Sequence, residues 1–276
     1  MTASTRGKFS ALQISPLASL ALLTAAGLAL RFISIGKWPL WGDEGLTLLI
    51  GQWSIMNLFL APIDPTPGLY YALHKIFLGP MVDAAGARSI SLLCGTLLIP
   101  AVYFLAKEMR LPALLSAALT ALSFPLIDYS QEARPYALLV LLTVLSAFCF
   151  VRWNRIGRLS DLLGALLFCL LAFYTHFVSI FWIGPIAAAT FALARRKSAL
   201  PLLLAAILAV PEVTRILRYR EGGFAWLLEA TPAQAADTLS RAFLPFRPTS
   251  PWLAVAAVLL GWRFWVHRSA IAAWVR

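Results

Sequence analysis

The sequence predicts an all-α polytopic membrane protein, and three observations lead to that fold class. Apolar residues make up 61% of the 276 residues, 13% are charged, and the mean hydropathy is +0.80, whereas a soluble domain is about 45–50% apolar and about 25% charged. Several runs approach the roughly 20 residues that a helix needs to cross a bilayer. These runs are apolar on all sides and lack the alternation of a membrane barrel strand, so we expect a bundle of helices.

Eight apolar runs are the candidate spans. In chain order they cover residues 16–36, 88–106, 111–128, 135–151, 160–177, 178–194, 199–217 and 251–266. The first run follows two basic residues, as in a signal peptide, but no small-residue cleavage site ends it, so we expect it to be retained. Cys94, Cys149 and Cys169 fall inside the runs and are expected to be small buried hydrophobic residues.

Segment 37–87 is too long for a turn, and we expect it to form a first outer loop with short helices of its own. Prolines open the stretch "PTPGLYYALHKIFLGP" and Gly79-Pro80 closes it, which predicts a helix too short to span. It is expected to lie along the interface, with Tyr70, Tyr71 and His74 at headgroup level. A last outer loop is expected over 218–250, and the chain is interpreted as one transmembrane module, 1–276.

The net charge of +11 is interpreted as topogenic, which argues against a nucleic-acid partner. Short connections between the runs carry most of the basic residues outside the last loop: Lys107, Arg110, Arg152, Arg155, Arg158, Arg195, Arg196, Lys197, Arg263 and Arg268. With these connections inside, we expect a multi-pass membrane protein whose N-terminus lies inside. Four polar stretches then share the outer face, namely "WGDEG", "DYSQEARPY", "YTH" and "RILRYREGG". We expect a site assembled from them.

Asp43 and Glu44 are the candidate catalytic pair, because two crowded carboxylates beside Trp38 and Trp41 favour a general base. The alternative, that both acids interact with the dipole of the following helix, stays open.

Four further residues are candidates for binding a phosphate: Arg134, Glu132, Arg88 and Arg218. An arginine offers a planar, permanently charged fork for such a group. Alternatives for these residues are an internal Glu132 to Arg134 pair, headgroup contacts, and a pairing of Glu212 with Arg215 or Arg218.

His176, Asp64 and Asp128 are candidate metal or substrate contacts. A lone histidine is more commonly a hydrogen-bonding residue, and a metal site would need several of these acids brought close together. A divalent metal therefore stays open and its identity unknown. The chain contains no phosphate-binding loop, no dinucleotide fingerprint and no H-E-x-x-H motif. No other cofactor is expected, and the energy for any reaction would arrive on the substrate.

Five stretches carry a family resemblance: "WGDE", "PTPGLYY", "ARSISLLCGTLLIPAVYFLAKEM", "YSQEARPYALL" and "YTHF". In this order they resemble bacterial GT-C membrane glycosyltransferases over roughly residues 16–195. The resemblance is to the dolichyl-phosphate-mannose-protein mannosyltransferase-like group, glycosyltransferase family 39, with the aminoarabinose lipid A transferases as relatives. The expected fold is therefore a GT-C-like bundle of about eight transmembrane helices with interfacial helices in its first periplasmic loop.

The resemblance implies a multi-pass protein of a bacterial inner membrane that transfers a sugar from a polyprenyl-phosphate donor to a lipid, glycan or protein hydroxyl at the periplasmic face, with inversion. It makes Asp43 the base and Glu44 its companion, and places Arg134 and Glu132 in the donor pocket. The chain has "DPTP" where many relatives carry a histidine or an acidic-lysine pair. Relatives are usually longer, so three alternatives stay open: a minimal version of the enzyme, a product that lacks their C-terminal part, or half of a split enzyme that acts with a partner subunit. A transporter of polyprenyl-linked sugars and a non-catalytic partner that binds lipid-linked sugar are the alternative function classes.

Overall fold

The structure, a computed structural model, describes residues 15–61, 66–79 and 82–223, with the backbone alone for 193–198 and 219–223. These residues form helices joined by turns and loops, and they contain no strand. The α-helices are α1 (Pro16–Phe32), α2 (Gly42–Gly51), α3 (Ile55–Leu60), α4 (Leu69–Phe77), α5 (Ala84–Glu108), α6 (Ala113–Leu122), α7 (Phe124–Asp128), α8 (Tyr136–Ile156), α9 (Leu159–Phe173) and α10 (Ile180–Gly223), and the 3₁₀ turns are η1 (Tyr129–Gln131) and η2 (Phe177–Ser179). The all-α prediction is confirmed.

Within the described residues each expected apolar run is mostly helical, although residues 33–36, 123 and 174–176 are not. In the part of the chain that the structure describes, three helices are long and apolar enough to cross a membrane: Ala84–Glu108, Tyr136–Ile156 and Ala199–Arg218. A bent pair, Ala113–Leu122 with Phe124–Gln131, makes a fourth if it counts as one span. The apolar stretches Pro16–Phe32, Leu159–Phe173 and Phe177–Ala192 are shorter. These helices fit a multi-pass membrane protein. The total of eight stays a prediction, because 251–266 and the module boundary at 276 lie outside the described residues.

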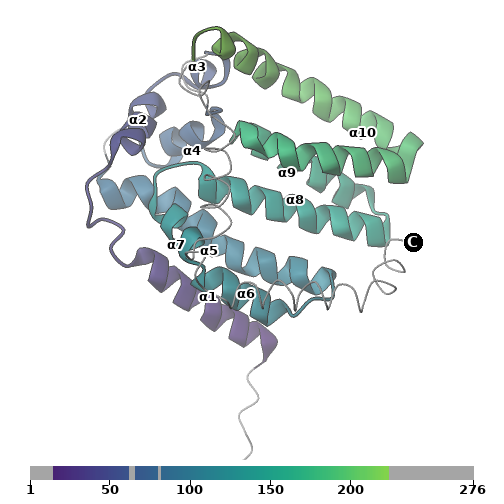
Figure 1. Cartoon of the computed structure of the whole chain (residues 1–276), viewed down its shortest axis with the longest axis horizontal. Coiled ribbons are helices and arrows are strands. Elements are labelled where there is room, and N and C mark those ends of the chain that lie inside the picture. Colours follow the sequence, from purple (N-terminus) through teal and green to yellow (C-terminus); the bar gives the residue numbers. More distant parts are fainter. Residues whose placement is uncertain (1–14, 62–65, 80–81, 224–276) are drawn as a thin grey trace, which may run out of the picture. The chain divides into compact units, whose positions relative to one another are not determined.

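Helices α5 and α8 run side by side in the same direction at the centre of the described bundle (Figure 1). Near their first turns, the Ser91 hydroxyl on α5 donates to the carbonyl of Arg134 just before α8, at 3.0 Å. At their last turns Arg155 and Glu108 form an ion pair at 2.6 Å. The 25 residues of α5 correspond to about 37 Å of helix. We call the end with Ser91 and Arg134 the site end; Arg155 and Arg152, predicted to lie on the inner side, are at the opposite end.

Short helices α2, α3 and α4 gather at the site end (Figure 1). The prediction of a short helix in this segment is confirmed, because α4 has 9 residues. Tyr70, Tyr71 and His74 face the protein interior, because all three side chains are at most 2% exposed; their position at headgroup level stays a prediction. The Tyr70 hydroxyl is 2.7 Å from the Ser91 hydroxyl, and Nε2 of His74 is 2.8 Å from the Ala87 carbonyl oxygen. This face of α4 therefore packs on α5, and burial lowers the pKa of His74.

The candidate span 111–128 is broken between α6 and α7, which meet at 63°. Pro125 causes the break, since it has no N–H to donate to the carbonyl of Ala121 and its ring obstructs a continuing helix. The chain then passes through α7 and η1 to the turn at 132–135, which precedes α8.

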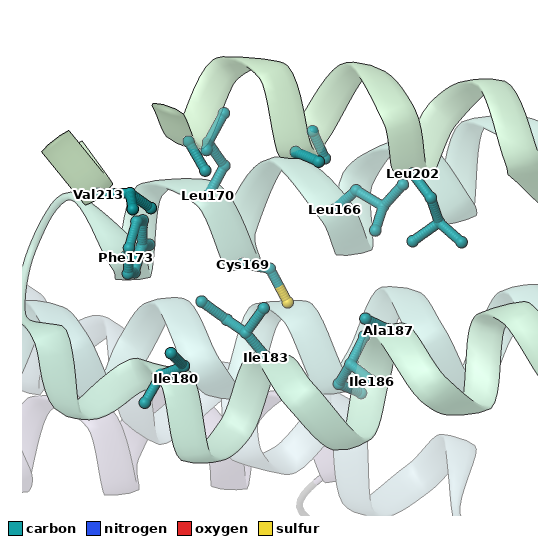
Figure 2. Close-up of a pocket in the computed structure, with 13 residues that line it drawn as sticks. Leu166, Cys169, Leu170, Phe173, Ile180, Ile183, Ile186, Ala187, Leu202 and Val213 are labelled. Carbon is teal, nitrogen blue, oxygen red and sulfur yellow. The ribbon is translucent and has the colours of Figure 1, made fainter. Parts of the chain in front are cut away.

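Helix α10 doubles back on itself. Residues 180–187 and 202–213 line the same apolar cavity of about 220 Å³ beside α9, although in a straight helix Ile180 and Val213 would be about 50 Å apart. Figure 2 shows Ile180 and Ile183 on one arm and Leu202 and Val213 on the other, with Cys169 of α9 between them. The expected separate spans 178–194 and 199–217 thus correspond to the two arms. All three cysteines are free, and Cys94 and Cys169 are buried.

Candidate active site

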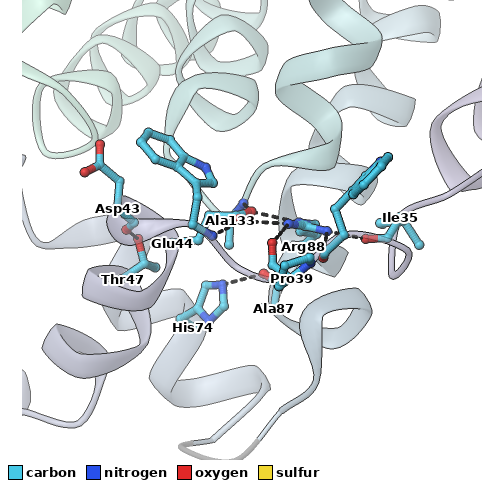
Figure 3. Close-up of polar contacts among 11 residues, drawn as sticks. Ile35, Pro39, Asp43, Glu44, Thr47, His74, Ala87, Arg88 and Ala133 are labelled. Atoms are coloured by element: carbon cyan, nitrogen blue, oxygen red, sulfur yellow. Dashed lines mark hydrogen bonds and ion pairs between the residues drawn. The ribbon is translucent and has the colours of Figure 1, made fainter.

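Adjacent acids Asp43 and Glu44, in the first turn of α2, have different environments (Figure 3). The Glu44 side chain is fully buried and accepts hydrogen bonds on both oxygens. Its Oε1 accepts from Arg88 Nε at 2.8 Å and from the Ala133 N–H at 2.7 Å. Its Oε2 accepts from Arg88 Nη2 at 2.7 Å and from the Trp41 N–H at 3.3 Å. With about four lone-pair sites on a carboxylate, Glu44 has no acceptor site left for a substrate.

Arg88 likewise has all of its hydrogen-bond donors in use. Besides its two bonds to Glu44, its Nη1 donates to the carbonyls of Ile35 at 2.7 Å and Trp38 at 3.0 Å, and its Nη2 donates to Pro39 at 3.3 Å. A guanidinium has five N–H donors, and all five are used. This geometry suits Arg88 to hold the segment that leads from α1 to α2, and leaves it no donor for the predicted contact with a phosphate.

The electrostatics of Glu44 follow from these contacts. Burial alone raises the pKa of Glu44, but the hydrogen bonds from Arg88 and Ala133 together with the charge of Arg88 outweigh it. Its pKa therefore lies below the ordinary value of 4.5. Glu44 is therefore ionised at neutral pH and a poor proton acceptor. Its contacts suit it to hold Arg88 and the backbone at Ala133 in place, and do not suit it to act as a general base.

Asp43 remains open. Its side chain is 47% exposed, and its Oδ2 lies 3.8 Å from Nη2 of Arg134. A weaker contact joins Nη1 of Arg134 to the backbone carbonyl of Asp43 at 3.4 Å. The structure thus brings together a half-exposed carboxylate and a guanidinium from segments 91 residues apart, as the sequence predicted for the outer cluster.

Arg134 is fixed through its backbone. Its carbonyl accepts from Ser91, whose hydroxyl also contacts Tyr70, and the neighbouring Ala133 N–H is bound by Glu44. Both bonds come from segments that surround the turn at 132–135. The cation therefore has a set position opposite Asp43, and its side chain is buried.

Glu132 is half-buried in the same turn and forms no hydrogen bond or ion pair within the described part of the chain. Burial raises its pKa above the ordinary value of 4.5, and the negative charges of Asp128 and Glu44 add to this, while Arg134 and Arg88 act in the opposite direction. The alternative of an internal Glu132 to Arg134 pair is not what forms, because Arg134 pairs with Asp43. Glu132 therefore places a carboxyl group near Arg134, and Asp128 is close enough to raise the pKa of that group further.

His176 lies at the site end, between α9 and η2. Its Nδ1 accepts from the Val178 N–H at 3.3 Å, and its ring is 5.8 Å from that of Tyr136, two residues after Arg134. Another ring contact links Tyr136 to Tyr129 at 5.1 Å. In residues 15–61, 66–79 and 82–223 no group of three or more His, Cys, Asp or Glu side chains could hold a metal ion. Asp64 lies outside these ranges.

Arg218 is exposed near the end of α10 and forms no ion pair within the described residues. Its neighbour Arg215 is buried and pairs with Glu212 at 2.7 Å, which confirms the alternative that Glu212 has a partner on its own helix. Arg215 also borders a small cavity with Asn57, Thr66 and Tyr71. Residues that the sequence reasoning missed are Ala133, Ser91, Ser130, Gln131 and Arg31, of which only Arg31, a charge in an apolar run, carried a signal.

Comparison with known families identifies the chain. Residues 65–214, which carry Arg88, Glu132, Arg134 and His176, match the family model for dolichyl-phosphate-mannose-protein mannosyltransferase. The chain belongs to this family. Its members are membrane glycosyltransferases of the GT-C type that use a lipid-linked sugar donor and an acceptor. Asp43 and Glu44 precede the matched region. No curated protein matches the chain.

Proposed function

We propose that this mannosyltransferase-family protein transfers a sugar from a polyprenyl-phosphate donor to an acceptor hydroxyl at the periplasmic face of a bacterial inner membrane. The observation that carries the proposal is the division of labour at the site end. Glu44 and Arg88 use their hydrogen-bonding positions on each other and on the backbone. The carboxylate of Asp43 is instead half-exposed and lies opposite the guanidinium of Arg134.

Asp43 is the general base in this proposal. It accepts the proton of the acceptor hydroxyl while that oxygen attacks the anomeric carbon of the donor sugar. The bond between the anomeric carbon and the phosphate oxygen breaks at the same time, and its electron pair leaves with the polyprenyl phosphate. Because one in-line displacement occurs, the anomeric configuration is inverted.

Arg134 stabilises the leaving group. Negative charge develops on the departing phosphate, and a guanidinium aimed at that charge stabilises it more than it stabilises the bound donor. A planar fork can bind two phosphate oxygens together. Since the leaving phosphate supplies the driving force, no nucleotide takes part.

Turnover in proteoliposomes with a radiolabelled polyprenyl-phosphate sugar tests the proposal. Asp43→Asn keeps the size of the side chain and removes its basicity, so turnover should fall by about 10²–10⁴-fold. Asp83→Asn is the matched control, because Asp83 is an exposed acid that caps α5, and asparagine caps equally well. Full turnover by Asp43→Asn contradicts the base assignment. Sugar that crosses the bilayer without bond cleavage indicates a transporter, and donor binding without turnover indicates a partner subunit.

A further inference from the structure

Arg31 is a buried cation that the proposed chemistry does not use. It lies in the last turn of α1, its side chain is fully buried, and within the described part of the chain it has no carboxylate partner. An unpaired charge inside an apolar bundle is costly unless its donors are satisfied. Polar groups around it must therefore supply the compensation.

Those groups belong mainly to the break between α6 and α7. Arg31 Nη1 donates to the Ala121 carbonyl and Nη2 to the Thr120 carbonyl, both at 3.0 Å. The last carbonyls of a helix have no partner within it. Ala121 would need an N–H from residue 125, which is a proline. Arg31 thus satisfies the carbonyls that the break leaves free.

The same arginine reaches the segment after the break. Its Nε donates to the hydroxyl of Ser130 at 3.2 Å. In return Gln131 Nε2 donates to the carbonyls of Arg31 at 3.0 Å and Ile33 at 2.8 Å. Arg31 and Gln131 form a reciprocal bracket between the end of α1 and η1. Residue 131 is only three positions before Arg134, so the bracket sets where the turn at 132–135 begins.

Glycines make room for the bracket. A Cβ on Gly95 would lie 1.9 Å from the Ser130 hydroxyl oxygen and 3.3 Å from Arg31 Nε, and one on Gly27 would lie 3.3 Å from Arg31 Nη1. The close approach of α1, α5 and η1 around the guanidinium therefore depends on two positions without side chains.

We propose that Arg31 is a positioning residue of the active site. By holding the α6–α7 break and, through Ser130 and Gln131, the start of the 132–135 turn, it sets the place of Arg134 relative to Asp43. Its catalytic consequence depends on the proposed function, whereas its effect on the position of α7 relative to α2 does not.

Distance measurements between two spin labels test the positioning directly. Exposed positions Leu49 on α2 and Phe124 on α7 accept the labels as Leu49→Cys and Phe124→Cys, in protein whose three native cysteines are replaced by alanine. The wild-type background should give one narrow distribution. Arg31→Gln should give a broader and shifted one, and Arg31→Lys an intermediate one, because a lysine has three donors on a single nitrogen. Gln131→Ala removes half of the bracket and should broaden the distribution less than Arg31→Gln.

Arg155→Gln is the matched control, since it removes an arginine from an ion pair at the opposite end of α8 and should leave the distribution unchanged. A folded Arg31→Gln protein with the wild-type distribution overturns the proposal. If that variant does not fold, unchanged distributions in both Arg31→Lys and Gln131→Ala overturn it instead.

Turnover provides the second readout. A displacement of about 1 Å between catalytic groups can cost about 10²-fold in rate, so turnover by Arg31→Gln should fall about 100-fold while Arg155→Gln stays active. If the unmutated protein shows no turnover, the proposed function fails, and the distance distributions still decide whether Arg31 positions the turn.

Discussion

Replacement of Glu44 by glutamine is the sharpest test of the division between the two adjacent acids. Glutamine has nearly the same size, but its amide nitrogen turns one of the two oxygens into a donor. Glu44 accepts two hydrogen bonds on each oxygen, so two of the four are lost whichever way the amide points. A hydrogen bond to a charged group contributes about 1.5–3 kcal/mol, and breaking a buried ion pair costs about 3–5 kcal/mol. Two lost hydrogen bonds give about 3–6 kcal/mol and the broken ion pair about 3–5 kcal/mol, so we take a loss of about 3–5 kcal/mol, the range common to both.

Thermal unfolding in detergent measures this loss. At about 2–4 °C per kcal/mol for a domain of this size, the midpoint for Glu44→Gln should fall by about 6–20 °C. Glu108→Gln is the matched control, because its partner Arg155 is half-exposed at 51% and such pairs contribute about 0–1 kcal/mol. A midpoint for Glu44→Gln within about 2 °C of the wild type would refute the view that Glu44 is an anchor.

Three further predictions follow from the site. Arg134→Lys keeps the charge but loses the planar fork, so kcat/KM for the donor should fall about 10- to 100-fold, as expected for one charge-assisted hydrogen bond; unchanged kinetics would argue against phosphate contact. The raised pKa of Glu132 means that the folded protein binds more protons than the unfolded chain just above pH 4.5, so stability should decrease as the pH rises through that window, and pH titration of Glu132→Gln should show a smaller decrease. Gly95→Ala should lower the unfolding midpoint because its Cβ would overlap Ser130, whereas Gly184→Ala, with nothing within 4 Å, should not.

Much of the fold could be predicted because the relevant signals are local. Runs of apolar residues predicted the helices, and prolines and glycines predicted the short α4. The gathering of Asp43, Arg134 and His176 at one end was predicted from where each run ends, since helices that cross the same layer bring their ends to two surfaces.

The remaining features depend on contacts between distant segments. Nothing local distinguishes Asp43 from Glu44; only the approach of Arg88 and Ala133 makes one an anchor and leaves the other open. Tyr70 and His74 have the amphipathic character of interfacial residues, yet hydrogen bonds to α5 bury them. The sequence predicts two spans, 178–194 and 199–217, joined by a loop of basic residues. The structure instead has one helical run, α10, that doubles back.

The anchor at Glu44 also has a consequence for synthesis of the protein. Arg88 follows it by 44 positions and Ala133 by 89, so a ribosome delivers the carboxylate well before any of its distant partners. Until Ala133 emerges, the Glu44 carboxylate must stay hydrated or be shielded by other factors. Release of a nascent chain before residue 133 would leave this carboxylate incompletely satisfied, a state that quality-control proteases could distinguish from the finished product.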